Sequence, residues 1–417
     1  MRIHSELNRL VSPALRLTPG NLKKGRGKKK LTIGRNRITR SEIKVDRPKE
    51  DKRRPAVIRT PKIWAPIKLE SFEDVLTSMK KNKDRQFHLL LGNGFSMAYD
   101  SDIFSYNALY EFIDTLDDEL LSKLFGIVNT KNFELIVRQL DTFLALLEAF
   151  GSDDKLKKKV ATASARLKQS LLDAIKALHP EHVFTLPQQK SDACARFLRF
   201  FMETGGHIYT TNYDLLLYWV LMRNKVLKSN DGFGRDRESP DEYVPEEELE
   251  YSELRWGKHR ENQVIFYVHG ALPLFDTGVE IIKEEYDNGN YLLENIGERI
   301  SNGEYPIFVT AGNGREKLTH IMHNRYLTHC YESLSSIEGS LVTFGFNFGE
   351  YDDHIIDAIN AAAKFGSNSP PKLWSIYIGV YSPEDKKRIE SIAPRIKCKV
   401  YIYDARTANV WAGAEKV

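Results

Sequence analysis

Short apolar runs recur along the chain, and most of them end in glycine or in a polar residue. A continuous apolar run of this kind is typical of a strand buried on both faces, as the strands of parallel sheets are. Longer segments with apolar positions every three or four residues separate these runs and predict amphipathic helices. The alternation predicts an α/β protein with a doubly wound, Rossmann-like parallel sheet. The predicted strands are 87–91, 207–210, 264–268, 306–310, 341–344, 374–379 and 400–403.

Helical periodicity is strongest between the first two predicted strands. Apolar residues form one stripe over residues 108–128, and the pattern repeats over 133–150. Residues 155–178 have the pattern of a long amphipathic helix, which Pro180 ends because proline cannot continue a helix. We therefore expect a helical insertion over about residues 100–205, with apolar stripes that belong to the core. A further helix is expected from Lys317 to Leu334.

The first predicted strand stops at Gly92, and Asn93, Gly94, Phe95 and Ser96 follow it. The two glycines permit positive φ and leave no Cβ between the backbone and a ligand. Ser96 and the residues after it can open a helix whose free N–H groups attract phosphate. This is the logic of a dinucleotide-binding turn. The usual third glycine is missing, however, and a purely structural turn has the same pattern.

Polar side chains follow two other predicted strands, at the edge where open α/β sheets bind ligands. Thr211, Asn212 and Asp214 come after the second strand. Asn212 can donate and accept, while Asp214 can accept from a ribose hydroxyl or only cap the next helix. His269 comes after the third strand. It serves there either as an acid, a base or a ligand-orienting group, or as a structural residue.

The predicted strand 341–344 is followed by Gly345 and Asn347, and the glycine allows the backbone to approach a ligand closely. His320 and His323 share a face of the helix expected over 317–334. No Glu or Cys completes a set of metal ligands there, so we expect no metal site.

Composition excludes several classes of protein. The chain has 417 residues and three cysteines, Cys194, Cys330 and Cys398, which are too far apart to form a disulfide framework or a Cys-x-x-Cys zinc site. We expect them to be small apolar side chains of the core. No apolar run approaches the roughly 18 residues that cross a bilayer, and the N-terminus lacks the apolar core of a signal peptide. A cytoplasmic protein is therefore expected.

The net charge of +4 conceals a basic N-terminal arm. Residues 1–65 hold 20 Lys and Arg against 5 Asp and Glu, which leaves a net charge of −11 on the remainder. With few large apolar groups, the arm is expected to be extended. It can contact nucleic acid, an acidic face of a partner or of its own chain, or serve as a solvated tail. Alternatively, the native product begins nearer Lys68. Residues 229–262 are acidic and predict a surface loop or lid.

The chain carries four motifs in this order: the glycine turn at Gly92 to Ser96, Thr210-x-Asn212-x-Asp214, Val268-His269-Gly270 and Phe344-Gly345. Together they resemble the ordered motifs of the sirtuin superfamily, and the resemblance covers about residues 70–405. Two short segments, Lys317-Leu318 and Asn324-Arg325-Tyr326-Leu327, resemble a signature of bacterial sirtuin-like proteins of anti-phage systems. Some of those proteins are encoded beside a HerA-type hexameric ATPase.

The resemblance implies that the chain binds NAD as its substrate, with Asn212, Asp214 and His269 as the catalytic group. It also implies a homo-oligomer and a HerA-type ATPase as partner. The implied contacts are Gly92, Asn93, Gly94 and Ser96 on the pyrophosphate, Thr211 in the same site, Asn212 and Asp214 near the nicotinamide ribose, His269 as the catalytic histidine, and Gly345 with Asn347 on the adenosine side.

Two departures from the deacylating sirtuins favour hydrolysis of NAD over deacylation. Those enzymes carry a four-cysteine zinc module, which three scattered cysteines cannot make, and they favour Ala and Ile where this chain has Asn93 and Phe95. The chain is therefore expected to be an NAD glycohydrolase that acts without a metal, as a regulated effector of abortive infection. Two alternatives remain open: a non-catalytic NAD or ADP-ribose sensor, and a nucleic-acid adaptor that works through the arm.

Overall fold

The computed structural model describes most of the chain from residue 68 onward, and all described residues belong to one compact unit, Ile63–Val417. The basic arm predicted over residues 1–65 lies outside them. Within the described part, no helix combines the length and the apolar character that a bilayer crossing requires. The described ranges are 68–81, 85–100, 119–128, 133–151, 154–180, 182–237, 251–285, 291–309, 313–349, 351–363 and 372–412.

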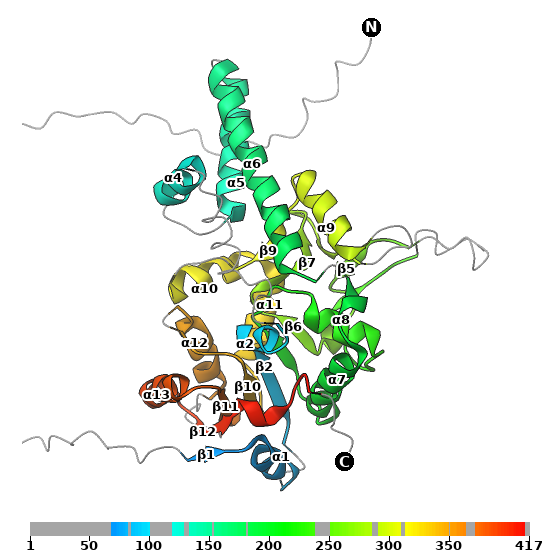
Figure 1. Cartoon of the computed structure of the whole chain (residues 1–417), viewed down its shortest axis with the longest axis vertical. Coiled ribbons are helices and arrows are strands. Elements are labelled where there is room, and N and C mark those ends of the chain that lie inside the picture. The colour runs from blue at the N-terminus through cyan, green and yellow to red at the C-terminus, as the bar shows by residue number, and fades with distance from the viewer. Residues whose placement is uncertain are drawn as a thin grey trace, which may run out of the picture. The chain divides into compact units, whose positions relative to one another are not determined.

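The central element is a seven-stranded sheet in which all neighbouring strands are parallel (Figure 1). We leave out the short edge strand β1 (Leu69–Glu70) and number the other six strands by their place in the chain. Their order across the sheet is then 3-2-1-4-5-6. This is the order of the dinucleotide-binding fold, and it confirms the predicted doubly wound sheet. In spatial order, the strands are β1 (Leu69–Glu70), β12 (Lys399–Asp404), β11 (Leu373–Val380), β10 (Gly339–Phe344), β2 (Phe87–Leu91), β3 (Ile208–Thr210) and β6 (Ile265–Tyr267).

The strand order reverses between β2 and β10. From β2 the chain adds β3 and β6 on one side, and later adds β11 and β12 beyond β10 on the other. In open α/β sheets, ligands bind beyond the carboxyl ends of the strands at such a point, where the connections on the two sides diverge. The carboxyl edge at β2 and β10 is therefore the candidate position for a ligand site.

Helices cover the sheet and bury the apolar faces that their spacing predicts. In α1 (Phe72–Lys81), Phe72, Val75 and Met79 are buried. α7 (Gln188–Glu203) packs on β2 and β3, whereas α13 (Pro383–Ile392) packs on β11. Figure 1 shows α7 and α8 (Leu216–Arg223) to the right of the sheet, and α12 (Asp353–Ala362) and α13 to the left. The remaining short helical turns are Val183–Thr185, Arg260–Asn262, Ala393–Arg395 and Ala405–Ala408.

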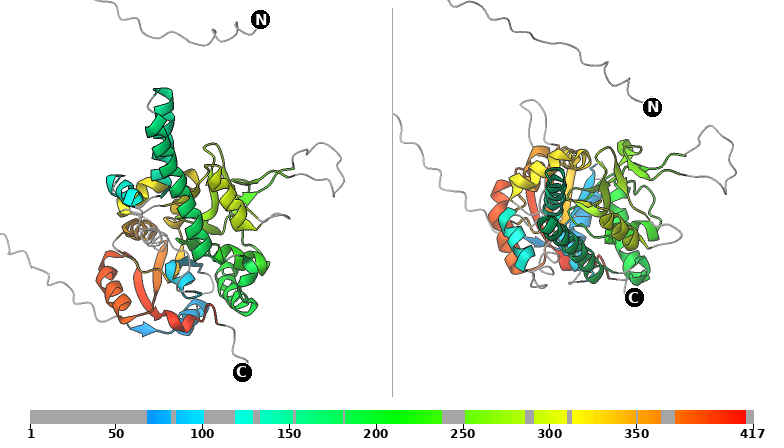
Figure 2. Two further views of the ribbon diagram at one scale, coloured as in Figure 1. Left: turned by 45° about the horizontal axis from the view of Figure 1, so that its top comes forward. Right: turned by 90° about the horizontal axis from the view of Figure 1, so that it is seen from above.

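The segment between β2 and β3 is helical in its described residues. α5 (Phe133–Ala149) and α6 (Asp154–Leu178) occupy the ranges that the periodicity predicts, and they pack along each other. Residues 101–118, where the predicted stripe of 108–128 begins, lie outside the described ranges. The same segment contains α2 (Asn93–Met97) and α4 (Glu119–Val128). Figure 2 shows α6 running away from the parallel sheet, past α9 (Leu292–Ser301).

A second, antiparallel sheet is formed by strands that lie before and after β6 in the chain, and the sequence pattern does not predict it. The expected parallel strand 306–310 is wrong, because β9 (Pro306–Phe308) pairs antiparallel with β7 (Gly270–Asp276). The expected surface loop 229–262 is wrong in part, because it contributes β4 and β5. A strand buried on both faces has the same apolar run whichever sheet it joins. The order of this sheet is β4 (Phe233–Gly234), β5 (Leu254–Trp256), β8 (Ile281–Lys283), β7 (Gly270–Asp276) and β9 (Pro306–Phe308).

The single helix expected from Lys317 to Leu334 is two helices, α10 (Gly314–His323) and α11 (Arg325–Leu334). Asn324 between them is extended, with φ −114° and ψ 123°, and its side chain accepts from the backbone N–H groups of residues 326 and 327. Asparagine is a strong N-cap because its side chain satisfies these otherwise unpaired donors. The prediction of one helix is wrong because apolar spacing does not register a local cap.

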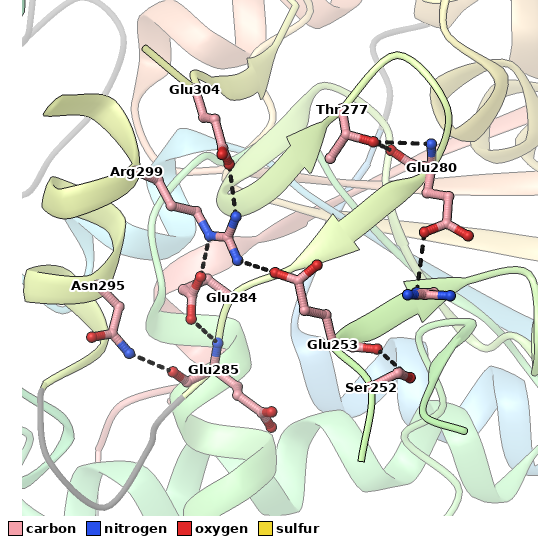
Figure 3. A network of polar contacts seen from close by, with 10 residues as sticks. Ser252, Glu253, Thr277, Glu280, Glu284, Glu285, Asn295, Arg299 and Glu304 are labelled. Carbon is pink, nitrogen blue, oxygen red and sulfur yellow. Dashed lines mark hydrogen bonds and ion pairs between the residues drawn. The ribbon is translucent and has the colours of Figure 1, made fainter. Parts of the chain in front are cut away.

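Arg299 of α9 joins its helix to the second sheet through three carboxylates (Figure 3). It pairs with Glu284, with Glu253 at 2.5 Å and with Glu304 at 2.7 Å. Burial alone would lower the pKa of Arg299, but the hydrogen bonds to these carboxylates outweigh it and raise the pKa. The guanidinium is thus the cation that allows three carboxylates to gather on this side of the sheet.

Replacing this cation should destabilise the fold. Arg299→Met keeps most of the apolar stem but leaves Glu284, whose side chain is 14% exposed, without its partner. We expect the free energy of unfolding, measured in urea, to fall by about 2 kcal/mol. As the control, Arg406→Met breaks an ion pair to Asp404 whose arginine is 62% exposed, and it should leave the unfolding midpoint unchanged. Equal midpoints for Arg299→Met and the unmodified chain would show that the network does not stabilise.

Candidate functional site

The predicted site residues all follow one row of paired residues across the parallel sheet. Leu91 pairs with Thr210 and with Phe344, and Thr210 pairs with Tyr267. Parallel strands in register end at the same edge, so the residues just after this row gather at the carboxyl edge of the sheet. They are Gly92, Asn93, Gly94 and Ser96 after β2, Thr211, Asn212 and Asp214 after β3, His269 after β6, and Gly345 and Asn347 after β10.

The glycine turns after β2 and β10 meet backbone to backbone. Gly94 N donates to Gly345 O at 2.8 Å, and Gly92 N donates to Phe344 O at 3.0 Å. A Cβ on Gly92 would lie 2.6 Å from Gly345 O, and one on Gly94 would lie 2.7 Å from Gly345 Cα. Gly92, with φ −120°, and Gly94 do not use the positive φ that glycine permits, whereas Gly345 does, at 68°. Close backbone contact, rather than a left-handed conformation, therefore requires glycine at 92 and 94.

Asn93 and Asn347 are the exposed side chains of this edge. α2 begins at Asn93, so Ser96 lies inside this short helix and not at its start as expected. Asn93 Nδ2 lies 3.2 Å from Met97 Sδ, and Asn347 Oδ1 accepts from Gly349 N at 3.1 Å. Both amides therefore stand at the surface, on either side of the point where the strand order reverses.

Ser96, Asn212 and Asp214 form one buried chain of hydrogen bonds. Ser96 Oγ donates to Asp214 Oδ2 at 2.5 Å, and Asn212 Nδ2 donates to Ser96 Oγ at 2.7 Å. The hydroxyl has one proton and gives it to the carboxylate, so it can only accept from Asn212. This fixes the orientation of the Asn212 amide. Its Oδ1 is then a buried acceptor that has no hydrogen-bond partner among the described residues.

Asp214 anchors one end of this series of hydrogen bonds. Its Oδ1 accepts from the N–H of Leu216, the first residue of α8, at 2.9 Å, and its Oδ2 accepts from Ser96, whereas the N-cap residue of α8 is Leu215. Each oxygen thus has one partner within the protein and keeps a second lone pair, so the expected contact to a ribose hydroxyl stays a prediction. Burial raises the pKa of Asp214 to about 6, although the bonds from Ser96 and Leu216 act to lower it. Thr211 completes the edge, because its N and Oγ1 both donate to Leu91 O, at 3.0 and 3.3 Å.

His269 lies in the turn between β6 and β7 and is 4% exposed. Its Nε2 is 2.8 Å from Nε2 of His354, in the first turn of α12, and the two rings stack with their centroids 5.0 Å apart. Burial lowers the pKa of His269 well below its ordinary value, and His354, Lys317 and His320 lower it further. Burial also lowers the pKa of His354, to about 3. Both imidazoles are therefore neutral at pH 7.

His354 is a residue of this edge that the sequence pattern did not indicate. The available signal was weak: a histidine in the first turn of the helix that follows the Gly345 turn. Lys317 of α10 stands on the same side and pairs with Asp352 at 3.0 Å, with side chains only 15% and 17% exposed. The ammonium group near two imidazoles opposes their protonation, which keeps the pair neutral.

The described ranges contain no set of metal ligands, because no three His, Cys, Asp or Glu side chains lie close together there. His323 Nδ1 bonds to Thr319 O at 2.6 Å. Cys194 and Cys330 are buried and Cys398 is partly buried, and burial raises the pKa of each thiol. The thiols therefore behave as small apolar side chains.

A side chain at residue 345 should disrupt the contact between the turns. In Gly345→Ala the new Cβ would lie 2.3 Å from Phe95 N, at a φ that L residues rarely adopt. We expect the free energy of unfolding to fall by about 3 kcal/mol or more. Gly126→Ala on α4 is the control, because nothing lies within 4 Å of its Cβ, and it should gain up to about 1 kcal/mol. Similar losses in both variants would contradict this account.

The pKa of Asp214 predicts a specific pH dependence. The folded value, about 6, is above the ordinary 3.8. The stability from this group is therefore fully present below about pH 4 and is lost as pH rises through 6. The free energy of unfolding relative to Asp214→Asn should fall by about 2.5 kcal/mol between pH 4 and pH 8. Taking this difference cancels the opposite contribution of the buried histidines. A difference that is constant, or that rises with pH, would refute the assignment.

A search of curated proteins found no match. The family model described as "Domain of unknown function (DUF4917)" matches residues 89–411. The match begins within β2 and ends at Trp411, whose Nε1 donates to Phe95 O at 2.8 Å, so it spans all the site residues described above. The chain therefore belongs to the DUF4917 family.

Proposed function

We propose that the chain is an NAD glycohydrolase that cleaves NAD to nicotinamide and ADP-ribose. The observation that carries the proposal is the conjunction of strand order and side chains at one edge. The six central strands have the order of the dinucleotide-binding fold. Asn212 and His269 each stand two residues beyond the paired row of Thr210 and Tyr267, on neighbouring strands.

The dinucleotide would lie across the point where the strand order reverses. The turns that contain Gly92, Gly94 and Gly345 present backbone without side chains there, which allows a pyrophosphate to approach closely. Asn93 and Asn347 stand exposed on the two sides and offer amide groups to phosphate or ribose oxygens. The nicotinamide ribose would then fall toward β3 and β6, where Asn212 and His269 are.

The chemistry follows from the states of these two side chains. The glycosidic bond breaks with its electron pair leaving on nicotinamide, which departs as a neutral molecule and needs no general acid. Asn212 Oδ1, the fixed acceptor, would bind a ribose hydroxyl or the water that adds to the anomeric carbon. His269 would orient or deprotonate a hydroxyl beside that carbon. The water loses one proton, and the products are nicotinamide, ADP-ribose and that proton.

A non-catalytic sensor of NAD or ADP-ribose is the second candidate. The observation that favours it is burial: Asn212 is 8% and His269 4% exposed, so a ligand must displace part of this edge to reach them. Binding without cleavage would use the same residues.

The proposal extends to the biological role that the resemblance implies. Uncontrolled loss of NAD would kill the host cell, so a glycohydrolase of this kind needs a trigger. We place the chain in a homo-oligomer that docks on a HerA-type hexameric ATPase and acts in anti-phage defence by abortive infection.

Turnover of NAD by the purified chain tests the proposal, alone and then with a HerA-type ATPase and DNA. Chromatography with mass detection should show nicotinamide and ADP-ribose in equal amounts. Asn212→Ala and His269→Ala should each lower kcat at least about a hundredfold. The exposed controls Asn262→Ala and His323→Ala should retain full activity.

All four variants must show the unfolding transition of the unmodified chain. Tight NAD binding without turnover under every condition would replace the hydrolase by the sensor. Turnover that survives both Asn212→Ala and His269→Ala would place the chemistry elsewhere.

A further inference from the structure

We propose that His354 is a positioning residue that sets the tautomer of His269, so that His269 presents a hydrogen-bond donor, Nδ1–H, to the substrate. The inference rests on the proposed function and makes the role of its histidine specific: His269 orients a ribose oxygen and does not act as the base. The two rings are buried, with His269 4% and His354 1% exposed.

The hydrogen bond between the two imidazoles limits where their protons can be. Two imidazole nitrogens 2.8 Å apart share a hydrogen bond, which requires one proton and one lone pair between them. A neutral imidazole carries its single proton on one nitrogen only. If His354 donates through Nε2, the proton of His269 is on Nδ1. If His269 donates through Nε2, its Nδ1 is bare and His354 carries its proton on Nδ1.

The far nitrogen of His354 decides between these two arrangements. Nδ1 of His354 is buried and has no hydrogen-bond partner among the described residues. Buried N–H groups without an acceptor are rarer in proteins than acceptors without a donor. Nδ1 of His269, by contrast, is not among the described buried atoms that lack a partner, so a proton there is not orphaned in the same way. The arrangement in which His354 Nδ1 is bare is therefore favoured. His354 then donates through Nε2, and His269 carries its proton on Nδ1.

The surroundings keep the pair in this neutral form. Lys317 and His320 of α10 face the pair, as does Asp353 of α12, and Lys317 is held by Asp352 at 3.0 Å. The Tyr213 ring stacks on His269 with centroids 6.5 Å apart, and the Tyr331 hydroxyl of α11 donates to His354 O at 2.9 Å. The hydrogen bond found for the His269 ring among the described residues runs through Nε2 to His354, so Nδ1–H is the group that this ring would offer to a ligand.

This assignment changes one step of the proposed reaction. The lone pair of His269 Nε2 accepts from His354, and Nδ1 already carries a proton, so His269 cannot take a proton from a substrate hydroxyl. It donates to a ribose oxygen instead. The proton lost when water adds to the anomeric carbon then passes to solvent, and the overall balance of the hydrolysis is unchanged.

Two substitutions separate the hydrogen bond from the packing. His354→Gln retains an amide that can bond to His269 Nε2, whereas His354→Phe retains a flat ring but no donor. We expect kcat in His354→Phe to fall about tenfold or more with KM within about twofold, and His354→Gln to recover most of the loss. Without the donor, His269 titrates nearer to its ordinary range, so an acidic limb appears in the pH profile of His354→Phe at higher pH than in the unmodified chain. A purely structural role would not move this limb.

The tautomer itself is measured without turnover, by ¹⁵N NMR of the chain labelled on histidine, with His269→Gln to assign the signals. The unmodified chain and His354→Gln should show His269 protonated on Nδ1, and His354→Phe should show a mixture of tautomers. A bare Nδ1 in the unmodified chain, or identical kinetics and pH limbs in both variants, would overturn the inference. If the chain cleaves no NAD, the proposed function fails while the NMR result still decides the role of His354.

Discussion

The hydrogen bond from Gly94 N to Gly345 O, at 2.8 Å, joins the two turns where the order of the parallel strands reverses. It forms only because neither turn carries a side chain at the contact. The contact sets how α2 lies against the sheet, and this brings Ser96 of α2 to Asp214 after β3. Trp411 also holds α2 in place, because its Nε1 donates to Phe95 O. The edge at which all the candidate residues gather thus depends on one approach of two backbones.

From this contact the electrostatics of the edge follow in two connected groups. The Asp214 carboxylate takes the proton of Ser96, which turns the Asn212 amide and leaves Oδ1 as an acceptor. Beside it, two neutral imidazoles are joined by one hydrogen bond, and the charge of Lys317 opposes their protonation. One group therefore presents an acceptor and the other a donor. A ribose, with several hydroxyls near a cleavable bond, is a ligand that needs both.

Much of this architecture could be predicted from the sequence because its causes are local. Buried parallel strands are continuous apolar runs, so six central strands and the polar residues after them were recognisable. The second sheet was not, because the run at 306–308 does not reveal that its partner is β7. Within the site, the sequence indicates the candidate residues of the four motifs, but it does not indicate the hydrogen-bond partners of Ser96, Asp214 and His269. These partners come from other elements, and only the folded chain determines which side chains meet.

The measurement that tests the central claim most directly is a structure of the chain with ADP-ribose bound. The account predicts the pyrophosphate along the turns at Gly92 to Gly94 and Gly345, with a ribose oxygen near Asn212 Oδ1 and His269 Nδ1. ADP-ribose bound away from the carboxyl edge of the parallel sheet would contradict it, as would an absence of binding at millimolar concentration.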